Sequence, residues 1–178
     1  MACAMFVPAV ENASSESGPW KLFMHPSSRY SVSYPRDWRV ATGPKGDFTI
    51  FNFPRERSIH GVVLPEHGAE IDISAREFAE DAVDEWIRKD LLDERPDYRK
   101  TINIPNAKCD GPQSFVEVSW KWEAGPGAYF REVAGYFVVH NRAFRAQLTF
   151  WEGDAEESQY RSILRHMISS LSVSRRKE

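Results

Sequence analysis

The sequence predicts an α+β domain in which two main amphipathic helices pack on a central antiparallel sheet. Three observations indicate this fold. Short segments that alternate apolar and polar residues recur along the chain, as they do in half-buried strands. Two longer segments repeat their apolar residues every three or four positions, as helices do. The chain has 178 residues, 42% of them hydrophobic, so it can bury one sizeable core.

The predicted domain covers residues 20–174, between an N-terminal segment over residues 1–19 and a basic tail over residues 175–178. Residues 2–10 form a short apolar run ahead of a Ser-rich stretch, which slightly favours an exported protein, periplasmic or extracellular, over a cytoplasmic one. The run lacks a basic segment before it and a small-residue cleavage site after it. We therefore expect a flexible segment, with a signal remnant as the alternative.

The composition argues against several classes of function. Lys and Arg number 23 against 26 Asp and Glu, a net charge of −3, so we expect no nucleic-acid partner. No apolar run is long enough to cross a membrane. The histidines and the two cysteines show no metal-binding spacing, so no metal and no cofactor are expected. His67 lies beside Glu66, but exposure in a loop explains this pair more simply than a surface metal site.

Most of the predicted elements are strands. They are predicted over residues 30–34, 47–53, 60–64, 69–73, 98–104, 115–122, 129–140 and 143–151. The strands over residues 60–64 and 69–73 are expected to form a hairpin around the turn at residues 65–68, because Pro and Gly are typical turn residues.

Each predicted helix begins with a capping pattern. Ser74 and Glu77 have the spacing of a capping box, so the first helix is expected to start there and to end before Pro96. Asp154 and Glu157 repeat this pattern ahead of the last helix. Its apolar stripe reaches Leu171, which predicts that it packs on the sheet.

The last two strands are predicted to pair through a two-residue turn at Asn141 and Arg142, because Asn tolerates the positive φ that such turns need. This register places Val139 opposite Phe144 and makes one face of the hairpin almost wholly apolar. The other face is mixed. It is expected to hold the following residues: Glu132, Tyr136, Arg145, Gln147 and Trp151.

This mixed face is the candidate partner-binding or ligand-binding site, since Tyr, Trp and Arg are enriched in binding surfaces. The alternative is that a helix covers the face and makes it a second core layer. No catalytic residue is predicted, because no serine has the spacing of a nucleophile elbow. Glu117 and Glu132 could form a pair of carboxylates near Arg145, although a solvated face with charge pairs is more typical.

The chain also resembles the PsbP-like superfamily, named for the extrinsic photosystem protein and shared with a Ran-binding nuclear-import factor. The resemblance lies in the aromatic strand that runs into Pro-x-x-Trp at Arg29–Trp38, in residues 62–71, in Tyr136–Leu148, and in the helix Tyr160–Leu171 followed by Ser-Val. It implies an α/β/α sandwich around an antiparallel sheet. It also implies use as an adaptor or accessory surface, not as an enzyme.

Three functions are consistent with these patterns. The first is a non-enzymatic accessory or protein-interaction domain whose partner is another protein. The second is a carrier of a small apolar ligand, with a pocket between sheet and helix. The third is an unrecognised hydrolase, which would need a serine or cysteine to meet a histidine and a carboxylate in space.

Overall fold

The computed structural model describes residues 19–25, 30–42, 47–54, 57–58, 61–62, 64–77, 116–139 and 142–173. Its elements in chain order are β1 (Trp20–Met24), β2 (Tyr30–Pro35), β3 (Arg39–Thr42), β4 (Phe48–Phe51), β5 (Arg57–Ser58), β6 (Gly61–Val62), β7 (Ala69–Glu77), β8 (Val116–Gly125), β9 (Ala128–Val139), β10 (Arg142–Trp151), α2 (Glu157–Ser170) and β11 (Ser172–Val173).

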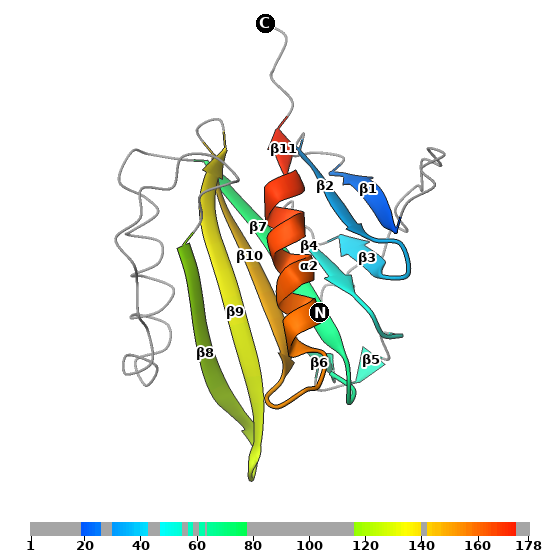
Figure 1. Ribbon diagram of the computed structural model, residues 1–178, viewed down its shortest axis with the longest axis vertical. Coiled ribbons are helices and arrows are strands. Elements are labelled where there is room, and N and C mark those ends of the chain that lie inside the picture. The colour runs from blue at the N-terminus through cyan, green and yellow to red at the C-terminus, as the bar shows by residue number, and fades with distance from the viewer. Residues whose placement is uncertain are drawn as a thin grey trace, which may run out of the picture.

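A six-stranded sheet in the order β3-β4-β7-β10-β9-β8 dominates the structure (Figure 1). A smaller sheet has the order β1-β2-β11, and β5 pairs with β6. Every pairing is antiparallel. Figure 1 shows α2 lying across one face of the large sheet, beside the smaller sheet. The predicted antiparallel α+β fold is confirmed.

One continuous core joins α2 and the smaller sheet to this face of the large sheet. The ring of Tyr30 on β2 meets that of Phe144 on β10 edge to face, with centroids 5.3 Å apart. Tyr160 on α2 contacts Phe150 and Trp38, and all of these side chains are buried. Trp38 is therefore a core residue.

The predicted faces of the β9–β10 hairpin are confirmed, but its register is wrong by two residues. Arg142 pairs with Val139, and Phe144 pairs with Phe137. A shift of two keeps every side chain on its face, because side chains alternate with a period of two. The apolar face therefore still packs into the core, and Tyr136 now pairs with Arg145.

Two local predictions about β7 are also wrong. The Ser74–Glu77 segment continues the strand instead of capping a helix, since it pairs with Arg142–Arg145 of β10. The strand does not form a hairpin with β6: its partners are β4 and β10, while β6 pairs with β5. In both cases long-range pairing outweighs a local pattern.

Helix α2 begins at Glu157, two residues later than an N-cap at Asp154 would set it. Asp154 still supports this end of the helix, because its side chain accepts the backbone N–H of Glu156 at 2.8 Å and its carbonyl accepts that of Glu157 at 3.2 Å. These bonds satisfy two amides that a helix start leaves without helical partners.

Several predictions lie outside the described residues: the first helix beyond residue 77, the strand over residues 98–104, residues 1–18 and the tail over residues 175–178. Within the part of the chain that is described, no helix has the length and apolarity to span a membrane.

Candidate binding site

The face of the large sheet that lies opposite α2 carries a group of polar side chains, here called the polar face. Sheet register brings five of them together, from β4, β7, β9 and β10: Thr49, Asp72, Glu132, Arg145 and Gln147. Tyr136 lies opposite Arg145 on the same face. The polar face thus contains four of the five residues predicted from sequence.

Hydrogen bonds organise the polar face. Gln147 Nε2 donates to Glu132 Oε2 at 3.1 Å, and the Thr49 hydroxyl donates to Asp72 Oδ1. Glu132 is only 3% exposed, so the bond from Gln147 offsets part of the cost of burying this carboxylate. The arrangement can hold polar groups, and its carboxylates already accept bonds from neighbouring side chains.

Trp151, the fifth predicted residue, lies on the same side of the sheet in a second, smaller core. It packs with Phe130, at a ring-centroid distance of 4.0 Å, against a cluster of buried residues: Ala41, Phe51, Phe53 and Leu64. Its indole N–H donates to the carbonyls of Leu64 and Pro65 at 3.0 and 3.1 Å. Trp151 therefore belongs to a second core layer, but the described residues that build this layer come from strands and turns and not from a helix.

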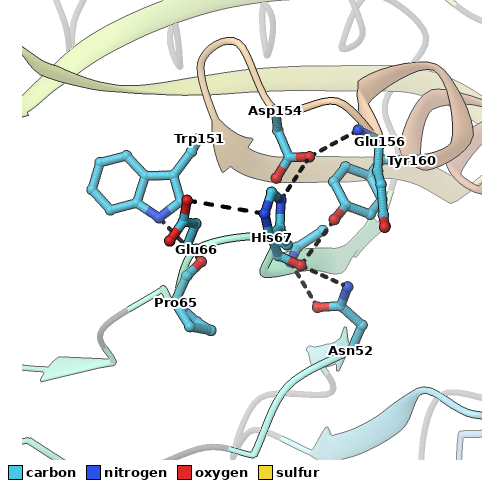
Figure 2. A network of polar contacts seen from close by, with 9 residues as sticks. Asn52, Pro65, Glu66, His67, Trp151, Asp154, Glu156 and Tyr160 are labelled. Carbon is cyan, nitrogen blue, oxygen red and sulfur yellow. Dashed lines mark hydrogen bonds and ion pairs between the residues drawn. The ribbon is translucent and has the colours of Figure 1, made fainter.

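The turn between β6 and β7 is clamped from three sides (Figure 2). Besides the Trp151 indole, the Tyr160 hydroxyl donates to the His67 carbonyl at 2.9 Å and Asn52 Nδ2 donates to it at 3.2 Å. His67 has a φ of 57°, a conformation that costs energy for a residue with a side chain and persists only where its surroundings hold it. The clamp holds this turn and projects His67 and Glu66 outward.

Two carboxylates flank the His67 imidazole, Glu66 on the turn and Asp154 before α2, and a third acidic residue, Glu156, stands next to Tyr160 at the start of the helix. Glu66 Oε1 lies 4.0 Å from Nε2 of the imidazole, and Asp154 Oδ1 lies 3.5 Å from Nδ1. Burial and, after it, the negative charge of Asp154 raise the pKa of Tyr160 far above its usual range. This group of three acidic residues is called the acidic corner below.

A row of apolar side chains lies on the strand β1, here called the β1 row: Trp20, Leu22 and Met24. Alternation places the three on one side of the strand. Leu22 is 44% and Met24 63% exposed, and they are the large hydrophobic side chains that the described part of the chain leaves exposed. Trp20 is half-buried and stacks on His166 of α2 at 3.7 Å.

No model of a known protein family matches this chain, and no curated protein sequence does. Solved structures do match. A crystal structure from Bacteroides thetaiotaomicron has a TM-score of 0.61 and 17% identity over 90% of this chain, which spans 51% of that protein's length. The Ran-binding protein Mog1p of Saccharomyces cerevisiae has a TM-score of 0.50 and 12% identity, covering 86% of this chain and 95% of Mog1p.

The cyanobacterial PsbP of Synechocystis also matches, with a TM-score of 0.49 and 14% identity over 92% of this chain and 99% of that one. The chain has the PsbP-like fold, as the matches to the Bacteroides structure and to Mog1p support. Identities this low show the fold alone, and they confirm the resemblance that the sequence indicated. The PsbP-like fold leaves function to be argued from the surface of this chain.

Burial divides the five residues predicted as a binding site on this PsbP-like scaffold. Tyr136 and Glu132 are buried, while Arg145, Gln147 and Trp151 are half-buried. Their role in binding stays a prediction, and it concerns chiefly Arg145 and Gln147. The side chain at position 117 lies outside the described residues, so the pair of carboxylates that Glu117 and Glu132 could form stays an untested alternative.

Of the three groups that a hydrolase site needs, the described residues bring together two, a histidine and a carboxylate. His67 and Asp154 form a histidine–carboxylate pair, but no serine or cysteine among the described residues contacts the imidazole. Within the same residues, no three His, Cys, Asp or Glu side chains are grouped so that they could hold a metal ion.

Sequence reasoning missed the β1 row, the acidic corner and the Asp72 side of the polar face. The row has a visible signal, because Trp20–Met24 alternates in the manner of a strand. So do Glu70, Asp72 and Ser74 on β7. The acidic corner has none, since it joins residues separated by about 90 positions and depends on the positive φ of His67.

Proposed function

We propose that this chain is a non-enzymatic protein-interaction domain that binds another protein through the β1 row. The exposure of Leu22 and Met24 on one side of an edge strand is the observation that carries the proposal. A contiguous exposed apolar row is typical of interaction surfaces, and an edge strand offers backbone groups to an added strand.

The energetics support a docking role. Fully burying a Leu or Met side chain contributes about 1.5–3 kcal/mol. Covering the exposed 44% of Leu22 would therefore contribute about 0.7–1.3 kcal/mol, and covering the exposed 63% of Met24 about 0.9–1.9 kcal/mol. Trp20 extends the row and its stacking on His166 ties β1 to α2. The row is therefore anchored before a partner arrives, which limits the entropy that binding costs.

The interior supports this proposal over the apolar-ligand carrier. Side chains of α2 and the sheet form one continuous buried cluster where such a ligand would have to sit. The fold is also compatible with a protein-interaction role, because Mog1p, which shares it, is a Ran-binding protein. Arg145 and Gln147 of the polar face remain a proposed additional contact.

Site-specific photo-cross-linking in the native host tests the proposal. A cross-linking amino acid at position 24 should capture a defined protein, whereas the same amino acid at the exposed position 162 on α2 should not. Leu22→Ser should reduce the captured amount, while lowering the free energy of unfolding by about 0.8–1.7 kcal/mol, because Leu22 is 44% exposed and just over half of its side chain is buried.

Three outcomes contradict the proposal: no product at position 24, the same products at positions 24 and 162, or a product that contains only a second copy of this chain. Gln159→Ser is the matched substitution, since Gln159 is an exposed residue on α2, and it should leave capture at position 24 unchanged.

A further inference from the structure

The acidic corner brings together three carboxylates from two separate elements. Glu66 lies on the turn before β7 and its side chain is 91% exposed, and Glu156 is exposed just before α2. Asp154 lies behind them with a side chain that is 1% exposed. Figure 2 shows the His67 imidazole between Glu66 and Asp154, and Glu156 next to Tyr160.

Among the residues that the structure describes, no lysine or arginine neutralises the charge of this corner. The neighbouring acids have such partners: Glu152 pairs with Lys121 at 3.2 Å and with Arg131 at 2.7 Å, and Glu157 pairs with Arg161 at 2.8 Å. Within the described part of the chain, no lysine or arginine pairs with Glu66, Asp154 or Glu156. His67 is the one ionisable group there that lies within ion-pair distance of Glu66 and Asp154.

A second observation points to a missing donor. Asp154 Oδ1 accepts the Glu156 N–H, but Oδ2 is buried and has no hydrogen-bond partner in the structure. A buried carboxylate oxygen without a donor is unfavourable. The neighbouring His67 side chain is 61% exposed, and its Nδ1 lies 3.5 Å from the other oxygen, Oδ1, which is the outer limit of hydrogen-bond distance.

We propose that the acidic corner binds an arginine side chain of a partner protein, whose guanidinium takes the place of the His67 imidazole between Glu66 and Asp154. This inference rests on the proposed function, since it names one chemical feature of the protein partner. A planar guanidinium presents several N–H donors at once and can bridge two carboxylates. An ammonium is a point charge and matches this geometry less well.

The clamp described above supports this role. The backbone of His67 is held by Tyr160 and Asn52, so the imidazole can turn about its side-chain bonds while the turn and Glu66 stay in place. The partial positive charge at the start of α2 acts against a cation, but the three carboxylates carry whole charges and outweigh it.

The test is an NMR titration of the full 15N-labelled chain with N-acetylarginine amide, N-acetyllysine amide and the neutral N-acetylcitrulline amide. Arginine should shift the amide signals of residues 66–69 and 154–157, more than lysine does, and citrulline should leave them in place. Asp154→Asn keeps the oxygen that accepts the Glu156 N–H but lacks the charge, so the apparent affinity should fall about threefold or more.

Matched variants keep the outcome decisive. Glu66→Gln/Glu156→Gln removes two exposed charges at the corner and should also weaken the arginine response, whereas Asp37→Asn/Asp47→Asn removes two exposed charges elsewhere and should not. The inference is overturned if citrulline or lysine matches arginine, or if both corner variants titrate like the wild-type chain. Leu22→Ser should titrate normally, so failure of the β1 row and failure of this inference are separable.

Discussion

The hydroxyl of Tyr160 offers a sharp test of the clamp, because Tyr160→Phe removes one donor and leaves the buried ring in place. The ring is 1% exposed and packs on Phe150 and Trp38, contacts that phenylalanine retains. The loss is therefore one hydrogen bond to the His67 carbonyl, with a net value of about 0.5–1.5 kcal/mol. Asn52 still donates to that carbonyl at 3.2 Å, so we expect about 1 kcal/mol and not the larger cost of an orphaned acceptor.

Urea unfolding followed by circular dichroism measures this loss, and thermal unfolding should show a Tm lower by about 2–4 °C. Tyr129→Phe is the control, because no hydrogen bond is formed by the Tyr129 hydroxyl among the described residues, and it should change stability by less than about 0.5 kcal/mol. Combining Tyr160→Phe with Asn52→Ala removes both donors to the His67 carbonyl, so the double variant should lose more than the sum of the singles. A Tyr160→Phe chain as stable as wild type, or strict additivity of the pair, refutes the clamp.

Two further predictions concern single buried positions. Burial lowers the pKa of His25 in the folded chain below its usual value of 6.5. As the pH falls below about 6.5, His25 therefore takes up a proton more readily in the unfolded chain than in the folded one, which destabilises the fold. The wild-type chain should accordingly lose stability between pH 7 and pH 5 relative to His25→Phe. Unfolding curves at both pH values measure this, and parallel changes in the two chains would show that His25 is not the cause. Gly68→Ala should lower the free energy of unfolding by about 1–3 kcal/mol, because a Cβ there would lie 2.7 Å from Pro65 Cδ and 2.9 Å from the Pro65 carbonyl oxygen. Calorimetry measures the change, and an unchanged Tm would contradict the tight packing of this turn.

The fold followed from periodicity where each strand or helix carries its own pattern. Tyr30–Tyr34, Phe48–Phe53 and the stripe of α2 are examples, and the faces of β9 and β10 were correct although the register was not. A two-residue error preserves the alternation, so no pattern within the hairpin reveals it. The helix start predicted at Ser74–Glu77 was wrong because the local capping pattern is outweighed by pairing with β10, which decides the conformation of this segment.

The candidate site was predictable only in part, because its components meet through long-range pairing. The mixed face of the hairpin was visible, whereas its neighbour Asp72 reaches Gln147 only through the β7–β10 pairing. Trp151 looked like a binding residue, since Trp is common at interfaces, but its indole instead holds the turn before β7. The acidic corner depends on a backbone conformation at His67 that composition does not reveal.

The most direct test of the β1 row is a comparison of affinities for the protein captured at position 24, purified and titrated calorimetrically into three forms of this chain. Relative to wild type, Leu22→Ser/Met24→Ser should bind at least about tenfold more weakly, which corresponds to about 1.4 kcal/mol. The matched exposed variant Gln159→Ser should bind as wild type does. Equal affinity of all three forms would contradict the assignment of the β1 row as the partner surface.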